Sequence, residues 1–259
     1  MQSRLVTANA AWAQRLLLKI VSRLPKQPGH LPLVYPRCNV ATGGSSIASL
    51  YSDVFCRESY ASPKPLPAAP RIIDAGGHLG MASLYFLQRY PSCHLTTLEP
   101  NPTLAALLRQ TLSGYGPQVV LLEAALSTSN GTSQFHITSD NLFNVTGGID
   151  NREAPDRAVT RLVVPQVDAR DVLREPVDLM KLDVEGHEYE LLPLPLFEPS
   201  HVRNLVVEFH DVERRSLQFR ALARTLMEER GYRAATTEDV ELDLAEVQQL
   251  TGCPVLKLF

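Results

Sequence analysis

From residue 71 onward, short apolar runs alternate with longer amphipathic stretches. Apolar runs bounded by glycine, proline or polar turns predict β-strands, and apolar residues three or four apart predict helices. Leu104, Leu108 and Leu112, for example, fall on one face of a helix. The expected strands are 71–75, 94–98, 119–125, 132–137, 177–183, 204–209 and 255–258. The expected helices are 81–90, 103–112 and 217–230.

Strands that alternate with helices form a parallel sheet covered by helices on both faces. We therefore expect an α/β fold with a doubly wound, mostly parallel, seven-stranded sheet. The tail 232–259 should supply the last two strands, and 132–137 should form a hairpin arm after the Asn130-Gly131 turn. Such sheets bind ligands at the carboxyl ends of their strands. The functional site is expected along that edge.

The first 53 residues differ in composition from the rest. No Asp or Glu precedes Asp53, whereas six Lys or Arg residues do. We expect a basic helical extension or cap over 1–53 and one main domain over 54–259. Three roles stay open for the extension: a helix that caps the domain or its substrate, an organelle transit peptide, or contact with an anionic membrane surface. Four prolines within 62–70 predict an extended linker.

Composition limits the classes of partner and the cellular location that we expect for the protein. The formal net charge is −3, and proteins that act mainly on nucleic acid usually carry a basic surplus, so nucleic acid is not the expected partner. The N-terminal apolar run is far shorter than the roughly 20 residues of a spanning helix, so no integral membrane segment is expected. The four cysteines form no Cys-x-x-Cys pair, which favours reduced thiols in the cytoplasm. An organelle remains the alternative location, and a homodimer stays open.

A glycine-rich turn follows the first expected strand and contains Asp74, Gly76, Gly77, His78 and Gly80. Glycine lets the backbone approach a ligand closely, and the helix that starts beyond it offers unpaired amides to an anionic group. The glycines do not fit the Gly-x-Gly-x-x-Gly dinucleotide fingerprint from either possible start, which disfavours a dehydrogenase. The spacing Asp-x-Gly-x-x-x-Gly is similar to the first motif of class I methyltransferases.

An acidic residue ends the next expected strand. Glu99 lies 19 positions after Gly80, near the spacing at which an acid binds ribose hydroxyls in nucleotide-binding folds. A carboxylate can accept hydrogen bonds from both vicinal hydroxyls. Pro100 and Asn101 follow in the same turn. Ala124 and Ala125, after the third strand, are expected to leave room for an adenine ring.

The run from Val177 to Leu192 contains Asp183-Val-Glu-Gly-His187. It resembles the signature of the FkbM family of S-adenosylmethionine-dependent methyltransferases. The glycine turn, the Leu98-Glu-Pro-Asn-Pro102 turn, Glu123-Ala-Ala-Leu-Ser127 and Val207-Glu-Phe-His210 match the family in the same order. The resemblance extends from about residue 54 to residue 210 and is loose beyond it.

The resemblance implies S-adenosyl-L-methionine as cofactor and O-methylation of a hydroxyl, on a sugar, glycolipid or secondary metabolite. The acceptor is then a small hydroxylated molecule. The candidate cofactor-binding residues are Asp74, Gly76, Gly77, His78, Gly80, Glu99, Pro100, Asn101, Ala124, Ala125 and Asp183. N- or C-methylation on the same scaffold and a catalytically inactive partner subunit remain alternatives, because a fold does not choose its acceptor.

Deprotonation of the acceptor hydroxyl calls for a base at the ends of the later strands. His210 is the first candidate, because the ordinary pKa of histidine is nearest neutrality, with Asp183 or Glu185 to orient it or to bind the acceptor. Asp183, Glu185, Glu208 and His210 are also hard-metal ligand types, but no tight spacing gathers them, so no metal is expected. The polar segment 138–158 is expected to cover the site, with Asn144 near cofactor or substrate.

Overall fold

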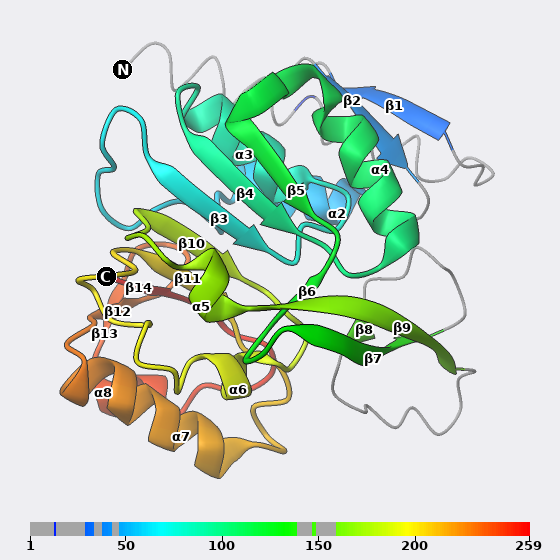
Figure 1. The fold of residues 1–259 in the computed structure, drawn as a ribbon. Helices are drawn as coiled ribbons and strands as arrows, with labels where there is room; N and C mark the ends of the chain where they lie inside the picture. The colour runs from blue at the N-terminus through cyan, green and yellow to red at the C-terminus, as the bar shows by residue number, and fades with distance from the viewer. Residues whose placement is uncertain (1–12, 14–28, 34–37, 43–46, 139–146, 149–158) are drawn as a thin grey trace.

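The computed structural model describes residues 13, 29–33, 38–42, 47–138, 147–148 and 159–259 (Figure 1). Most of the expected basic N-terminal helix, and Asn144 in the polar loop, lie outside these residues. Among the residues described, no helix is long and apolar enough to cross a membrane.

The central sheet has the expected doubly wound, mostly parallel form. Its strands are β3 (Arg71–Ala75), β4 (His94–Leu98), β5 (Val119–Leu122), β10 (Leu179–Leu182), β11 (Leu205–Glu208), β12 (Ala234–Ala235), β13 (Glu241–Leu242) and β14 (Val255–Leu258). They lie in the order β13-β12-β14-β11-β10-β3-β4-β5. Strand β14 runs antiparallel to both its neighbours. Seven strands match the expectation, and the two-residue β13 adds an eighth at the edge.

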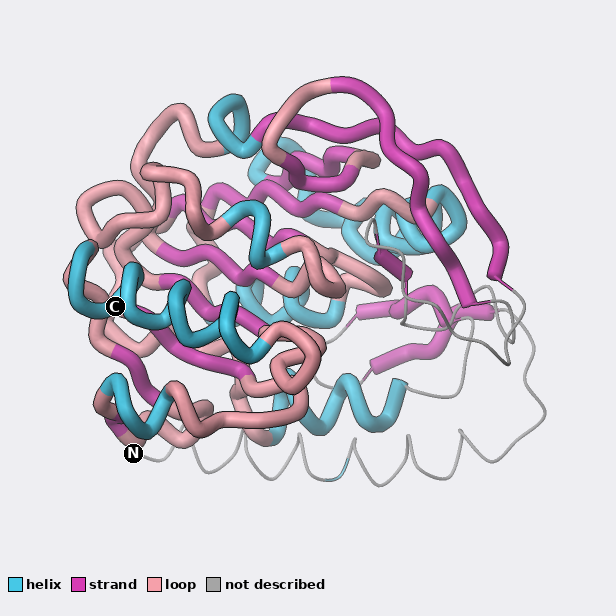
Figure 2. Tube along the Cα trace, turned by 90° about the horizontal axis from the view of Figure 1, so that it is seen from below, coloured by secondary structure: helices cyan, strands magenta, loops and turns pink. Residues whose placement is uncertain are grey.

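Helices cover both faces because successive strand residues point to opposite sides. On β3, Ile72 belongs to one core cluster and Ile73 to the other. The Ile72 side is covered by α3 (Met81–Arg89) and α4 (Pro102–Leu112). The Ile73 side is covered by α5 (Ala169–Val172), α6 (Glu188–Leu191) and α7 (Ser216–Arg224). Figures 1 and 2 show the sheet between these helices.

Local chemistry sets the helix boundaries. Asn101 begins α4, because its side chain accepts hydrogen bonds from the amides of Thr103 and Leu104, and Pro102 occupies the first helical position, where no amide is needed. The expected helix 217–230 forms as α7 and a π-helical turn, η3 (Thr225–Glu229). Short helices η2 (Ser113–Gln118) and α8 (Leu244–Val247) complete the strand connections.

A second, four-stranded sheet projects beside the first (Figure 1). It contains β6 (Ala125–Ser127), β7 (Gly131–Thr138), β8 (Gly147–Gly148) and β9 (Val159–Asp168) in the order β6-β9-β7-β8. The expected strand 119–125 is wrong in its second part: β5 ends at Leu122, and Ala125 already belongs to β6. The expected arm over 132–137 is confirmed as β7, but its antiparallel partner β9 was not expected.

The N-terminal part forms a strand pair, β1 (Gly29–Leu33) and β2 (Cys38–Thr42), followed by α2 (Ile47–Tyr51) and the turn η1 (Ser52–Cys56). The ring of Tyr51 is fully buried and stacks on Phe55 at a centroid distance of 4.9 Å. Both belong to the same core cluster as Phe86. The division at residue 53 stays a prediction, but the core of the domain already includes Tyr51.

Candidate active site

The glycine turn is held tightly between two neighbouring strands. The amides of Gly76 and Gly77 both donate to the carbonyl of Leu98, at 3.0 and 2.8 Å. Gly76 has φ +87°, and a Cβ there would overlap the carbonyl oxygen of Asp183. A Cβ on Gly77 would overlap the hydroxyl of Thr97. Glycine is therefore required here by the approach of β4 and β10, as well as for contact with a ligand.

Glu99 is fixed in the turn that follows β4. Its two carboxylate oxygens accept hydrogen bonds from the amides of His78 and Asn101, each at 2.8 Å. The side chain is 5% exposed, and burial raises its pKa to about 7, although the two amides oppose the shift. Because an ionised carboxylate can accept about four hydrogen bonds, Glu99 retains capacity for two hydroxyls.

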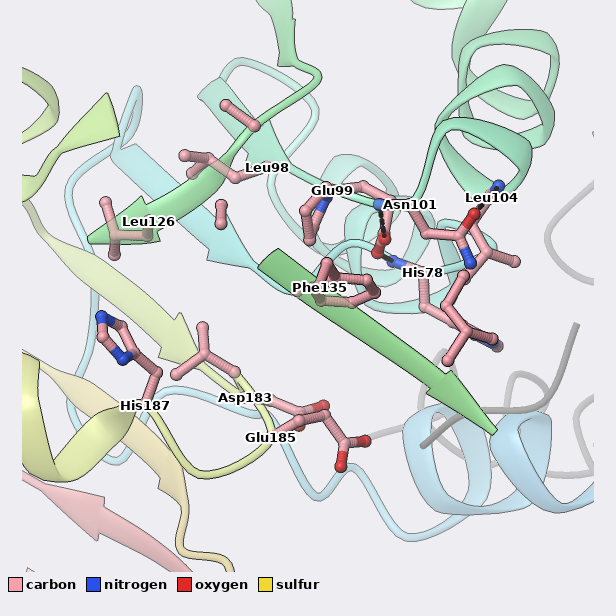
Figure 3. Close-up of a pocket in the computed structure, with 16 residues that line it drawn as sticks. His78, Leu98, Glu99, Asn101, Leu104, Leu126, Phe135, Asp183, Glu185 and His187 are labelled. Atoms are coloured by element: carbon pink, nitrogen blue, oxygen red, sulfur yellow. Dashed lines mark hydrogen bonds between the residues drawn. The ribbon is translucent and has the colours of Figure 1, made fainter. Parts of the chain in front are cut away.

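A cleft that opens to solvent lies at this edge of the sheet (Figure 3). The predicted cofactor residues in its wall are Gly76, His78, Glu99, Pro100, Asn101, Ala124, Ala125 and Asp183. The predicted residues Asp74, Gly77 and Gly80 do not line it, so any role of theirs is to shape the turn. The further wall residues, which are not among the predicted site residues, are Leu98, Leu104, Leu126, Phe135, Ile137, Val184 and His187.

Phe135 and Ile137 come from β7, so the second sheet forms one side of the cleft. Both side chains are buried and pack on Val164 of β9. A flat apolar wall suits an adenine ring, whereas Glu99 on another side suits ribose hydroxyls. No local motif marked Phe135, because its position depends on the pairing of β7 with β9.

Lys181 is a buried cation that the sequence reasoning missed. It is 3% exposed, and its Nζ lies 3.3 Å from Asp74 Oδ1 and 3.2 Å from Asp183 Oδ2. It also donates to the carbonyl oxygen of Gly76 at 2.7 Å. The two carboxylates raise the pKa of Lys181 against the opposing effect of burial. Its ammonium group therefore links the glycine turn to the end of β10. Asp74 also accepts a hydrogen bond from the Ser83 hydroxyl at 2.7 Å.

The three predicted catalytic residues meet at the carboxyl ends of β10 and β11. His210 Nε2 lies 3.6 Å from Glu185 Oε2 and 3.8 Å from Asp183 Oδ1. His210 Nδ1 lies 3.3 Å from Glu188 Oε1, and Glu188 is fully buried. Glu185 has φ +55°, a left-handed conformation that costs about 1–3 kcal/mol outside glycine and is concentrated at functional sites.

The electrostatics change the reason for assigning His210 as the base. Burial lowers its pKa, but the hydrogen bond to Glu188 and the charges of Glu185 and Asp183 outweigh burial and raise the pKa to about 9. The ordinary pKa of histidine, which was the reason for choosing His210 as the base, therefore does not describe this imidazole: its imidazolium form is favoured at pH 7. Asp183 is ionised, since Lys181 and His210 lower its pKa against burial.

Two further residues border this cluster. Glu208 Oε1 lies 3.9 Å from His210 Nε2, and Glu208 Oε2 accepts a hydrogen bond from the Tyr60 hydroxyl at 3.4 Å. The Tyr60 ring lies over Lys181, with Nζ 5.1 Å from the ring centroid. Burial and the nearby Asp183 charge raise the pKa of Glu208 to about 7. Tyr60 precedes the first strand of the sheet, so sequence spacing gave no sign of its place here.

The family model for the FkbM methyltransferase domain matches residues 74–234. The chain belongs to the FkbM methyltransferase family. It is therefore an S-adenosylmethionine-dependent methyltransferase of the α/β class I type, which confirms the cofactor inferred from the resemblance. The matched segment contains the glycine turn, Glu99, the wall of the cleft and the cluster around His210.

Relatives of the chain include methyltransferase sdnD of Sordaria araneosa, 28% identical over 234 residues, which cover 76% of this chain and 84% of that protein. Methyltransferase 1 of Beauveria bassiana is 26% identical over 210 residues, or 72% of this chain and 81% of that protein. A solved S-adenosylmethionine-dependent methyltransferase from Agrobacterium tumefaciens superposes on 91% of this chain and 70% of its own, with a TM-score of 0.48 and 11% identity.

The residues present fit S-adenosylmethionine. Glu99 supplies acceptors for hydroxyls, Phe135 supplies an apolar wall, and Gly76 lets the turn lie against the Asp183 backbone without a side chain in between. When bound, the cofactor supplies an electrophilic methyl group on sulfur. Asp183 lines both the cleft and the His210 cluster. The transferred group and the acceptor are therefore expected to meet beside Asp183.

Proposed function

We propose that this FkbM methyltransferase methylates a hydroxyl oxygen of a small molecule, in the class of sugars, glycolipids or secondary metabolites. The observation that carries the proposal is the cluster of Asp183, Glu185 and His210 at the edge of the cofactor cleft. Carboxylates accept hydrogen bonds from hydroxyls, and two of them in one place suit an acceptor with several hydroxyl groups.

The proposed roles follow from the positions of the side chains. Lys181 holds Asp183 Oδ2, which leaves Oδ1 for the acceptor side. Methyl transfer needs in-line placement of the acceptor oxygen, which hydrogen bonds to Asp183 and Glu185 provide. Bound S-adenosylmethionine would supply the methyl group that the hydroxyl oxygen takes, and the His210–carboxylate cluster would accept the hydroxyl proton. At the raised pKa of His210, the base is the cluster as a coupled unit rather than one neutral imidazole.

The test uses S-adenosylmethionine that carries a labelled methyl group. The protein is incubated with matched acceptors that present either a hydroxyl or an amine on the same carbon skeleton, and the product is examined by NMR. We expect label on oxygen. Label on nitrogen or carbon only would overturn the proposal, and cofactor binding without transfer to any acceptor would favour an inactive partner subunit.

The role of His210 is tested in the same assay. His210→Ala should lower turnover by about 10²–10⁴-fold, the range for loss of a general base, while cofactor affinity stays within about threefold. His94→Ala is the matched control, because His94 is exposed at the opposite end of the parallel strands. Full activity of His210→Ala would remove His210 from the chemistry.

A further inference from the structure

Three carboxylates surround one nitrogen of His210 at distances that are too long for hydrogen bonds. The Nε2 atom lies 3.6 Å from Glu185, 3.8 Å from Asp183 and 3.9 Å from Glu208. His210 is 5% exposed, and its Nε2 lies within ion-pair distance of all three carboxylates.

The opposite ends of Asp183, Glu208 and His210 are anchored. Asp183 Oδ2 is held by Lys181 at 3.2 Å, and Glu208 Oε2 by the Tyr60 hydroxyl at 3.4 Å. His210 Nδ1 faces Glu188 Oε1 at 3.3 Å. One oxygen of each of these carboxylates and one nitrogen of the imidazole are thus left to point at a common centre.

Glu188 determines how the imidazole is presented. Its carboxylate is fully buried and accepts hydrogen bonds from the amides of Gly186 and His210, at 2.8 and 2.6 Å. A carboxylate fixed in this way favours the proton on Nδ1, as in the carboxylate–histidine pairs that support metal ligands. Once Nε2 gives up its proton, its lone pair faces the oxygens of Asp183 and Glu185. A divalent cation between these atoms then takes the place of that proton, which otherwise offsets the charges of the carboxylates.

The distances lie close to those around an octahedral hard cation. At metal–ligand bonds of about 2.1 Å, adjacent ligands are about 3.0 Å apart and opposite ligands about 4.2 Å apart. Both Nε2–oxygen distances, 3.6 and 3.8 Å, fall between these values, and all three ligand atoms lie within 4.8 Å of one another. Small rotations of the two carboxylate groups would bring the three ligand atoms to the separations of an octahedral site. Two carboxylates and one imidazole suit Mn²⁺ or Mg²⁺ better than a soft metal.

We propose that Asp183, Glu185 and His210 bind a divalent cation of the Mg²⁺ or Mn²⁺ class beside the cofactor cleft. Three protein ligands leave coordination positions free. If the acceptor is a hydroxyl compound, which rests on the function proposed above, two vicinal hydroxyls can occupy these positions and be oriented toward the methyl group. A bound cation also lowers the pKa of a hydroxyl that coordinates it, which assists deprotonation.

Binding of Mn²⁺ tests the site without reference to activity. The protein is titrated with Mn²⁺ in the presence of S-adenosylhomocysteine, and free Mn²⁺ is followed by electron paramagnetic resonance. We expect one bound ion per chain. Glu185→Gln keeps the side-chain shape and should weaken binding by at least about tenfold, because ligand charge sets affinity in such sites. Glu190→Gln removes the same charge from an exposed position on α6 and should leave affinity unchanged.

Failure to bind Mn²⁺, or equal affinity in Glu185→Gln and the native protein, would overturn the cation site. Asp183→Asn gives a second test of the same ligand set if Glu185→Gln is poorly folded. The outcome is independent of the proposed function. Methylation of oxygen in excess chelator, with no Mn²⁺ bound, would remove the cation and keep the O-methyltransferase, whereas Mn²⁺ binding with label only on nitrogen would keep the site and overturn the hydroxyl acceptor.

Discussion

Replacement of Lys181 by methionine tests how the glycine turn is joined to the catalytic edge. The ammonium of Lys181 is the cation that compensates Asp74, which is fully buried, and it contacts Asp183, which is 22% exposed. Methionine fills a similar volume but leaves the carboxylates without their cation. Breaking a buried pair by removing one partner destabilises a protein by about 3–5 kcal/mol.

The structure places the expected loss at the lower end of that range, about 3 kcal/mol, because two effects reduce it. Asp74 keeps the hydrogen bond from Ser83 at 2.7 Å, and Asp183 gains hydration on its exposed side. For a chain of this length, about 3 kcal/mol corresponds to a fall in Tm of about 6–12 °C. The loss is measured by urea unfolding followed by circular dichroism, with a check that the m-value is unchanged.

Lys257→Met is the matched control. Lys257 is equally buried, at 1% exposed, but its partner Asp239 is 66% exposed. Water can take over the solvation of Asp239, so this substitution should cost only about 1 kcal/mol. Combining Lys181→Met with Asp74→Asn removes the uncompensated charge and should recover at least about 1 kcal/mol. Equal losses in the two lysine variants, or no recovery in the double variant, would refute the reasoning from buried charge.

Substitutions at two further positions, Glu99 and Gly76, probe the cofactor cleft. The affinity for S-adenosylmethionine should fall as the pH drops through about 7, the raised pKa of Glu99, because protonation removes acceptors for the ribose hydroxyls. Glu99→Gln should abolish this pH dependence. Glu99→Ala should weaken cofactor binding at least about tenfold, and calorimetry measures both effects. Unchanged affinity would remove Glu99 from the ribose site. Gly76→Ala should lower Tm and weaken cofactor binding at least about tenfold. The new Cβ would overlap the carbonyl oxygen of Asp183, and alanine disfavours the left-handed φ of this position. Gly114→Ala is the control, because a Cβ at position 114 has no atom within 4 Å.

Local pattern was sufficient for most of the central sheet. Strands β3, β4, β10 and β11 and helices α3 and α4 lie where the apolar runs and leucine spacing predicted them. Glycine spacing and the acid at Glu99 identified one side of the cleft. These features depend on backbone geometry and on side-chain periodicity within a few residues, which the order of amino acids alone determines.

Partners far apart in the sequence were not predictable in this way. Lys181 lies opposite Asp74 only because the parallel register of β10 and β3 pairs these two residues. Phe135 enters the cleft only because β7 pairs with β9, and Tyr60 approaches Glu208 across 148 positions of the chain. Each of these contacts depends on which strands become neighbours, and no local periodicity encodes that choice.

The cluster around His210 shows the same division most clearly. The sequence alone supplied its members, because Asp183, Glu185 and His210 belong to motifs that end two strands. It gave no spacing that would gather them around one centre, and for His210 it offered only the ordinary pKa of histidine. The tertiary structure decided both properties, since parallel strands end side by side and a buried imidazole takes its pKa from the carboxylates that the fold packs against it.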